Sequence, residues 1–171
     1  MRIMHISLGG CLSAPPVKYG MTEDTGGHIA YVLGAAMAQA KLPEVEEVTI
    51  VTRLFDAPEL GAVFAQAEEE IGPKCRVLRL ASDRAEYLEK GDLVGELPSL
   101  QNALLETLEQ MGAARPDAII ASSRDEVERQ IPKLVPAAEG RAHRIGPGVC
   151  VEAKGDAARA REMLGGFLRD V

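Results

Sequence analysis

The chain has 171 residues, enough for one domain that buries most of its apolar surface. Its net charge of -7, with no cluster of Lys and Arg, argues against a nucleic-acid or membrane-surface partner. The three cysteines, Cys11, Cys75 and Cys150, have neither the paired spacing of a zinc site nor the density of a disulfide scaffold. We therefore expect reduced thiols, no metal and no cofactor.

No apolar run reaches the roughly 18 residues of a membrane span. Met1 and Arg2 lead straight into a strand pattern, with no signal-peptide region between them. These features predict a cytoplasmic protein without a membrane partner.

Residues 2–8 are the first predicted strand. After Arg2 they are apolar except for His5 and Ser7, as in a parallel strand that is covered on both faces. We expect His5 to be a packed or hydrogen-bonded core residue and not a ligand. The strand leads into a loop rich in Gly and Pro at residues 9–21.

A helical pattern begins after the adjacent glycines Gly26 and Gly27. Its apolar positions have the spacing of one buried helix face: Ile29, Val32, Leu33, Ala36, Met37 and Ala40. Either Thr25 or Asp24 is expected to cap it. Because glycines carry no side chain, an anionic group can approach the free N–H groups and the positive end of the helix dipole. The pattern predicts an anion site, and the alternative is a simple tight turn.

Residues 48–52 form the second predicted strand, rich in β-branched side chains. Arg53 follows its carboxyl end, where open α/β sheets bind ligands, and the alternative is a surface pair with Asp56. Residues 54–74 are expected to be a long excursion with one helical turn and a solvated acidic run. The alternation of residues 75–80 predicts an edge strand.

The remaining elements alternate between helix and strand. Residues 98–111 form a helix that ends at Gly112, and residues 117–121 form the next buried strand. A capping-box spacing opens a helix at residues 123–131, for which Ser122 and Ser123 are caps and not nucleophiles. Residues 143–145 are the last strand, and residues 156–169 have helical spacing.

This order predicts an α/β fold. We expect a single Rossmann-like domain at residues 1–150, with a mainly parallel sheet of about five strands and helices on both faces. The strand order should be near 3-2-1-4-5, which puts a ligand-binding switch point beside the first strand. Residues 151–171 form a separate carboxyl-terminal helix.

Three segments carry a resemblance to a known family: residues 5–8, residues 22–33 and residues 48–53. They resemble the amino-terminal, acceptor-side domain of retaining GT-B glycosyltransferases, in the sucrose-phosphate synthase and mannosylfructose-phosphate synthase branch. The resemblance implies a role in hexosyl transfer from a sugar nucleotide to a sugar phosphate. It also implies that residues 151–171 correspond to the segment between the two domains of such an enzyme.

The resemblance also implies a binding site. Lys90 stands where the family has a Lys that contacts the phosphate of the acceptor, and His28 stands where it has a Gln that contacts the acceptor sugar. With Gly26, Gly27 and Arg53 they are the candidate substrate-binding residues. No catalytic residue is assigned. The alternative for Lys90 is a mobile surface lysine, and Val94 replaces the usual Trp of the family.

The sequence departs from the family in its second half. Residues 115–126 begin like one family segment and end like a later one, so the His motif that faces the donor sugar is absent, as is the donor domain. We therefore expect no activity of the chain alone, weak binding of a sugar phosphate, and an uncovered flank that pairs with a second copy or with a separate donor-domain subunit. The alternative is a non-catalytic module for sugar-phosphate binding or subunit interaction. An unrelated nucleotide-binding Rossmann domain is disfavoured, since no Gly-x-Gly-x-x-Gly follows the first strand.

Overall fold

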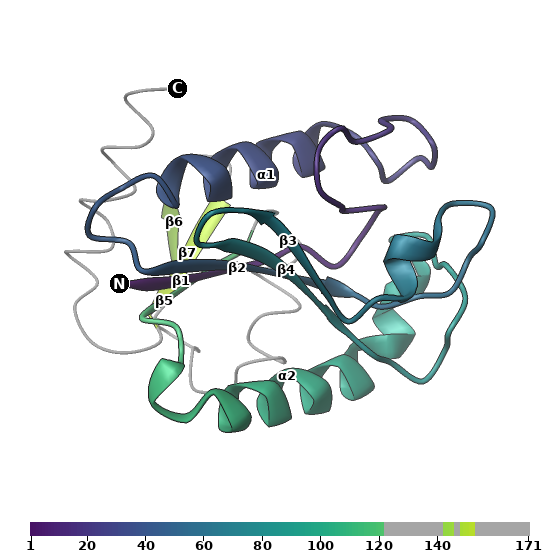
Figure 1. The fold of residues 1–171 in the computed structure, drawn as a ribbon. Helices are drawn as coiled ribbons and strands as arrows, with labels where there is room; N and C mark the ends of the chain where they lie inside the picture. Colours follow the sequence, from purple (N-terminus) through teal and green to yellow (C-terminus); the bar gives the residue numbers. More distant parts are fainter. Residues whose placement is uncertain (122–141, 146–147, 153–171) are drawn as a thin grey trace.

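The computed structural model describes residues 1–121, 142–145 and 148–152, and in this part of the chain the strands form one sheet of seven. The order is β3-β4-β2-β1-β5-β7-β6 (Figure 1). The strands are β1 (Arg2–Ile6), β2 (Glu47–Arg53), β3 (Glu68–Gly72), β4 (Cys75–Leu80), β5 (Ala118–Ala121), β6 (Ala142–Ile145) and β7 (Gly148–Glu152). The central strands β4, β2, β1 and β5 pair in parallel, which confirms the predicted α/β fold.

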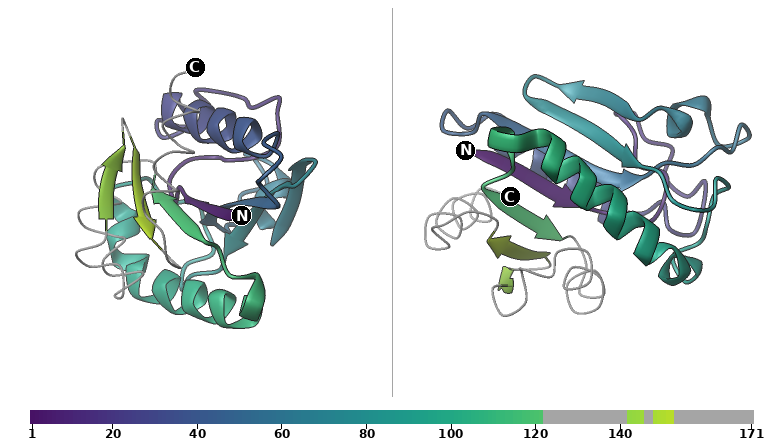
Figure 2. Two further views of the ribbon diagram at one scale, coloured as in Figure 1. Left: turned by 90° about the vertical axis from the view of Figure 1, so that its left-hand side faces the viewer. Right: turned by 90° about the horizontal axis from the view of Figure 1, so that it is seen from below.

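One long helix covers each face of the sheet (Figures 1 and 2). They are α1 (Gly27–Gln39) and α2 (Leu97–Met111), and the short 3-10 helices are η1 (Ala62–Ala65), η2 (Asp92–Glu96) and η3 (Gly112–Ala114). Successive side chains of a strand point to opposite faces. Ile3 of β1 therefore packs in a buried cluster with Ile29 of α1, whereas Met4 packs in another with Leu100 and Leu104 of α2. None of the helices described in this chain is both long and apolar enough to cross a membrane.

His5 lies in the core between β1 and α1, as expected. Its side chain is buried, and Nε2 lies 2.7 Å from Oε1 of Gln39 near the end of α1. Since an amide oxygen only accepts, Nε2 carries the proton and donates it. Burial lowers the pKa of His5 to about 4, so the ring is neutral in the fold at pH 7.

The prediction that residues 75–80 are an edge strand is wrong. The acidic run that was expected to be solvated lies in β3, which pairs antiparallel to β4 and forms the edge instead. The reason is an ion pair: Nη2 of Arg79, whose side chain is fully buried, lies 2.5 Å from Oε2 of Glu69. A buried guanidinium needs hydrogen-bond acceptors, and Glu69 of β3 gives Arg79 one that is also negatively charged. Glu68 and Glu70 on the same strand are exposed, and the single helical turn expected in this excursion is η1.

The other end of the sheet also differs from the predicted order. The strand expected at residues 143–145 is β6, but β7 lies between it and β5 and pairs antiparallel with both. Strand β7 extends to Glu152, past the domain boundary expected at residue 150. The helices predicted at residues 123–131 and 156–169 lie outside the described residues.

Candidate functional site

Three segments of the chain meet beyond the carboxyl end of β1, around Gly9. A side chain added at Gly9 would place its Cβ 3.9 Å from Cβ and Cγ of Lys90, and Nε2 of His28 donates to the Gly9 carbonyl at 3.3 Å. The backbone N–H of Lys90 donates to Oδ2 of Asp24 at 2.5 Å. The structure therefore brings His28 and Lys90, two of the predicted site residues, to the same loop.

The close approach of these segments depends on Gly10. Its φ of +80° lies in the left-handed region, and a Cβ there would lie 2.4 Å from the carbonyl oxygen of Asp24 and 2.8 Å from Cδ1 of Ile29. Only glycine adopts this positive φ without strain and leaves room for Asp24 and Ile29, because it has no Cβ. The adjacent glycines Gly9 and Gly10 can be seen in the sequence, but the contact of Gly10 with Asp24 cannot be predicted from it.

Helix α1 begins without a side-chain cap. Gly26 is the N-cap residue, and the predicted caps were wrong because both side chains bond elsewhere. Thr25 Oγ1 accepts from the backbone N–H of Cys11 at 2.9 Å, and the Asp24 carboxylate accepts from Lys90. A Cβ added at Gly26 or at Gly27 would meet nothing within 4 Å, so no neighbouring group crowds these two residues at the start of α1.

A chain of hydrogen bonds holds the same segments together from inside. Tyr87 Oη donates to Thr22 Oγ1 at 3.0 Å, Thr22 Oγ1 lies 2.7 Å from Thr25 Oγ1, and Thr25 accepts from Cys11. Burial raises the pKa of Tyr87 to about 12 and also raises the pKa of the Cys11 thiol. Both groups are therefore neutral at pH 7. Cys11 and Cys75 are free thiols, as predicted.

Several acidic groups lie near Glu89, the residue before Lys90. The pKa of Glu89 is raised, chiefly because its carboxylate loses hydration. A hydrogen bond with Asp24 and the negative charges of Asp24, Glu23 and Asp92 raise this pKa further. A site with one lysine among these acids attracts an anion only weakly. Across the residues that the structure describes, no group of three or more His, Cys, Asp or Glu side chains could hold a metal ion.

Arg53 lies beneath the loop that leads to Lys90. It is 2% exposed, and it donates from Nε to Ser82 Oγ at 2.9 Å, from Nη1 to the carbonyl of Glu86 at 2.8 Å and from Nη2 to the carbonyl of Arg84. The alternative interpretation of Arg53, a surface pair with Asp56, is therefore wrong. Burial lowers the pKa of Arg53.

Glu96 supports the same loop from the other side. It is buried, and its Oε2 accepts from the backbone N–H of Arg84 at 2.9 Å. Sequence reasoning missed this residue, since its acceptor role depends on the packing of η2 against the loop. Val94, where the resembled family has Trp, is 61% exposed and forms no buried wall.

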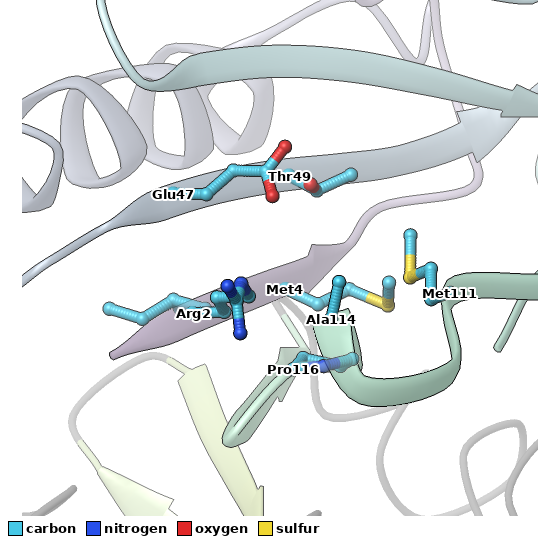
Figure 3. A pocket seen from close by; sticks show the side chains of 8 residues that line it. Arg2, Met4, Glu47, Thr49, Met111, Ala114 and Pro116 are labelled. Carbon is cyan, nitrogen blue, oxygen red and sulfur yellow. The ribbon is translucent and has the colours of Figure 1, made fainter.

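A small hollow lies at the opposite end of the sheet, where β1 and β2 begin (Figure 3). Its lining includes Arg2, Met4, Glu47, Thr49 and Met111. The space inside is about 10 Å³, roughly that of one water molecule, so a sugar phosphate does not fit there. This hollow is separate from the predicted site, which lies at the carboxyl end of β1.

Comparisons with known proteins agree with the resemblance. No protein-family model matches the chain. A probable sucrose-phosphate synthase 2 from Craterostigma plantagineum is 39% identical over 67 residues, which are 39% of this chain and 6% of that protein. A probable sucrose-phosphate synthase 2 from Arabidopsis thaliana is 32% identical over 71 residues, 42% of this chain and 7% of that protein.

The solved structures similar to this chain include sucrose-phosphate synthase from Thermosynechococcus elongatus. It aligns with a TM-score of 0.49 and 28% identity, over 65% of this chain and 25% of that chain. The chain thus spans only a small part of the relatives it matches.

Proposed function

We propose that this chain, which is similar to sucrose-phosphate synthases over 67 to 72 residues, is a glycosyltransferase-like domain that binds the sugar-phosphate acceptor of a hexosyl transfer. The observation that carries the proposal is the meeting of the uncapped start of α1 with Lys90. Asp24 and Lys90 are joined by a hydrogen bond although they lie 66 residues apart in sequence.

The chemistry of these groups suits a phosphate ester. The N–H groups at the uncapped start of α1, at Gly26 and Gly27, donate to phosphate oxygens, and the helix dipole adds to the attraction. Lys90 supplies a positive charge that needs no fixed geometry. His28, one residue further along, donates from Nε2 to the Gly9 carbonyl, so its Nδ1 accepts a hydrogen bond from a hydroxyl group of the sugar.

The proposed role is restricted to binding of the acceptor. Transfer of the hexosyl group requires donors that stabilise the departing diphosphate of a sugar nucleotide. We assign no such donor in this chain, and propose that a donor-binding domain supplies them. Arg53 remains a candidate only as a support of the Lys90 loop, because its guanidinium is engaged there.

The first prediction is that fructose 6-phosphate binds at this site in the full chain. We expect a Kd on the order of millimolar, about 4 kcal/mol, because the site is open to water and its charges are screened. Titration followed by backbone amide chemical shifts should move residues 25–29 and the neighbours of Lys90.

The matched variants for this titration are Lys90→Ala and Lys41→Ala. Lys41 is an exposed lysine that lies beyond the other end of α1, whereas Lys90 is half-buried. Lys90→Ala should abolish saturable shifts, and Lys41→Ala should leave them unchanged. The proposal is wrong if wild-type protein shows no saturable shift at residues 25–29.

The second prediction concerns the acidic groups. Glu89→Gln should tighten the binding of fructose 6-phosphate about two- to threefold, since it removes a negative charge next to Lys90 at an exposed, screened position. The same titration measures it. Glu109→Gln, an exposed acid near the end of α2, should have no effect. If both variants bound fructose 6-phosphate more tightly by the same factor, the change in net charge alone would account for the effect, and the prediction would be wrong.

A further inference from the structure

We infer that Asp24 is a positioning residue, which holds the main chain of Lys90 and thereby sets where the lysine ammonium group lies relative to the start of α1. This inference rests on the proposed function of the site. It adds a residue that neither the helix pattern nor the resemblance assigns to binding.

The hydrogen bond between the two residues is short and directed. The N–H of Lys90 donates to Asp24 Oδ2 at 2.5 Å in a partly buried position, and a bond to an ionised carboxylate is among the stronger hydrogen bonds in proteins. The stem of Lys90 lies next to Gly9. Asp24 therefore holds the main chain of Lys90, while the first part of the Lys90 side chain lies beside the Gly9 loop.

Asp24 is itself held in place by its main chain. Its carbonyl oxygen lies against Gly10, where a Cβ would come within 2.4 Å. The next residue, Thr25, donates its N–H to the carbonyl of Thr22 at 3.1 Å, and its own carbonyl accepts from Gly20 at 2.8 Å. Because this turn runs directly into Gly26, the same residues fix both Asp24 and the start of α1.

Two other roles of an acidic residue, helix capping and charge attraction, do not explain the presence of Asp24 at this position. Asp24 does not cap α1, because no side-chain hydrogen bond caps that helix. Its negative charge opposes binding of a phosphate and raises the pKa of the neighbouring Glu89. An acid that is electrostatically adverse at an anion site is explained by the hydrogen bond that it accepts from Lys90.

The negative charge of Asp24 and its hydrogen bond to Lys90 have opposite effects on phosphate binding. Substitutions of Asp24 in the full-length chain therefore distinguish the two. If only charge mattered, Asp24→Ala would tighten the binding of fructose 6-phosphate. If Asp24 positions Lys90, Asp24→Ala should weaken it about tenfold, the effect of losing one charge-assisted hydrogen bond. Asp24→Asn keeps an acceptor oxygen without the charge, so it should bind at least as tightly as wild type.

Asp92→Ala is the matched control. Asp92 contributes to the negative charge around Glu89, but the Lys90 N–H does not bond to it. This variant should bind fructose 6-phosphate slightly more tightly than wild type. Tighter binding in both Asp24→Ala and Asp92→Ala would overturn the inference.

The amide signal of Lys90 gives a readout that does not depend on the ligand. An amide proton bonded to a carboxylate is strongly deshielded, so the signal should move upfield in Asp24→Ala, move less in Asp24→Asn and stay in place in Asp92→Ala. An unmoved signal in Asp24→Ala overturns the inference. If wild-type protein fails to bind fructose 6-phosphate while this signal moves as expected, the proposed function fails and the hold of Asp24 on Lys90 stands.

Discussion

Substitution of Gly10 by alanine should lower the free energy of unfolding by roughly 3–5 kcal/mol, the range of severe point mutations. Two causes add. A φ of +80° strains an alanine by about 1–2 kcal/mol, and its Cβ would lie 2.4 Å from the carbonyl oxygen of Asp24. The carbonyl belongs to the main chain before α1, so the loop or the helix must shift to relieve the contact.

Gly20 provides a matched control for this prediction. Its φ is +78°, nearly that of Gly10, but a Cβ there would meet nothing within 4 Å. Gly20→Ala should therefore show the backbone strain alone, about 1–2 kcal/mol. Urea unfolding followed by circular dichroism measures both variants. Equal losses would mean that the close approach of Gly10 to Asp24 contributes nothing to stability.

The sequence predicts the central part of the fold because the signals there are local. The apolar run of β1 and the helical spacing of α1 and α2 each lie within a single element. The parallel pairing of β1 with β2 and with β5 agrees with the helix that precedes each of these partners, α1 before β2 and α2 before β5. The edge was mispredicted because Glu69 and Arg79 reveal their pairing only when β3 folds back on β4.

The site is predictable in part for a related reason. The resemblance pointed to His28 and Lys90, and the structure brings both to Gly9. The role of Asp24 could not be read from the sequence, since its partner lies 66 residues away. The rule that ligands bind beyond strand ends placed Arg53 near the site, but it could not show that the following loop covers its guanidinium.

The free energy of unfolding should decrease strongly as the pH is lowered, because His5 is neutral in the folded protein. The pKa of His5 is about 4 in the fold and about 6.5 in an unfolded chain, so below pH 6.5 the unfolded state binds more protons. The free energy of unfolding should therefore be highest above pH 6.5 and fall as the pH decreases from 6.5 to 4. At pH 5 the free energy of unfolding should be roughly 2 kcal/mol lower than at pH 7.5 because of His5 alone.

The contribution of His5 can be separated from that of the other titrating groups by comparing variants. His5→Gln removes the titrating ring and keeps an amide that can donate to Gln39, so it should lose about 2 kcal/mol less than wild type between pH 7.5 and pH 5. His28→Gln keeps His5 and should retain the wild-type slope. Urea unfolding at the two pH values measures all three proteins, and a slope in His5→Gln as steep as in wild type would contradict the prediction.

The ring signals of His5 in wild-type protein test the same prediction without any substitution. A ring that is buried against α1 and donates to Gln39 should stay neutral, and its NMR signals should not move between pH 7.5 and pH 5. A midpoint near 6.5 would mean that the folded protein accommodates the charged ring at no cost. In that case burial of His5 between β1 and α1 could not make the fold sensitive to acid.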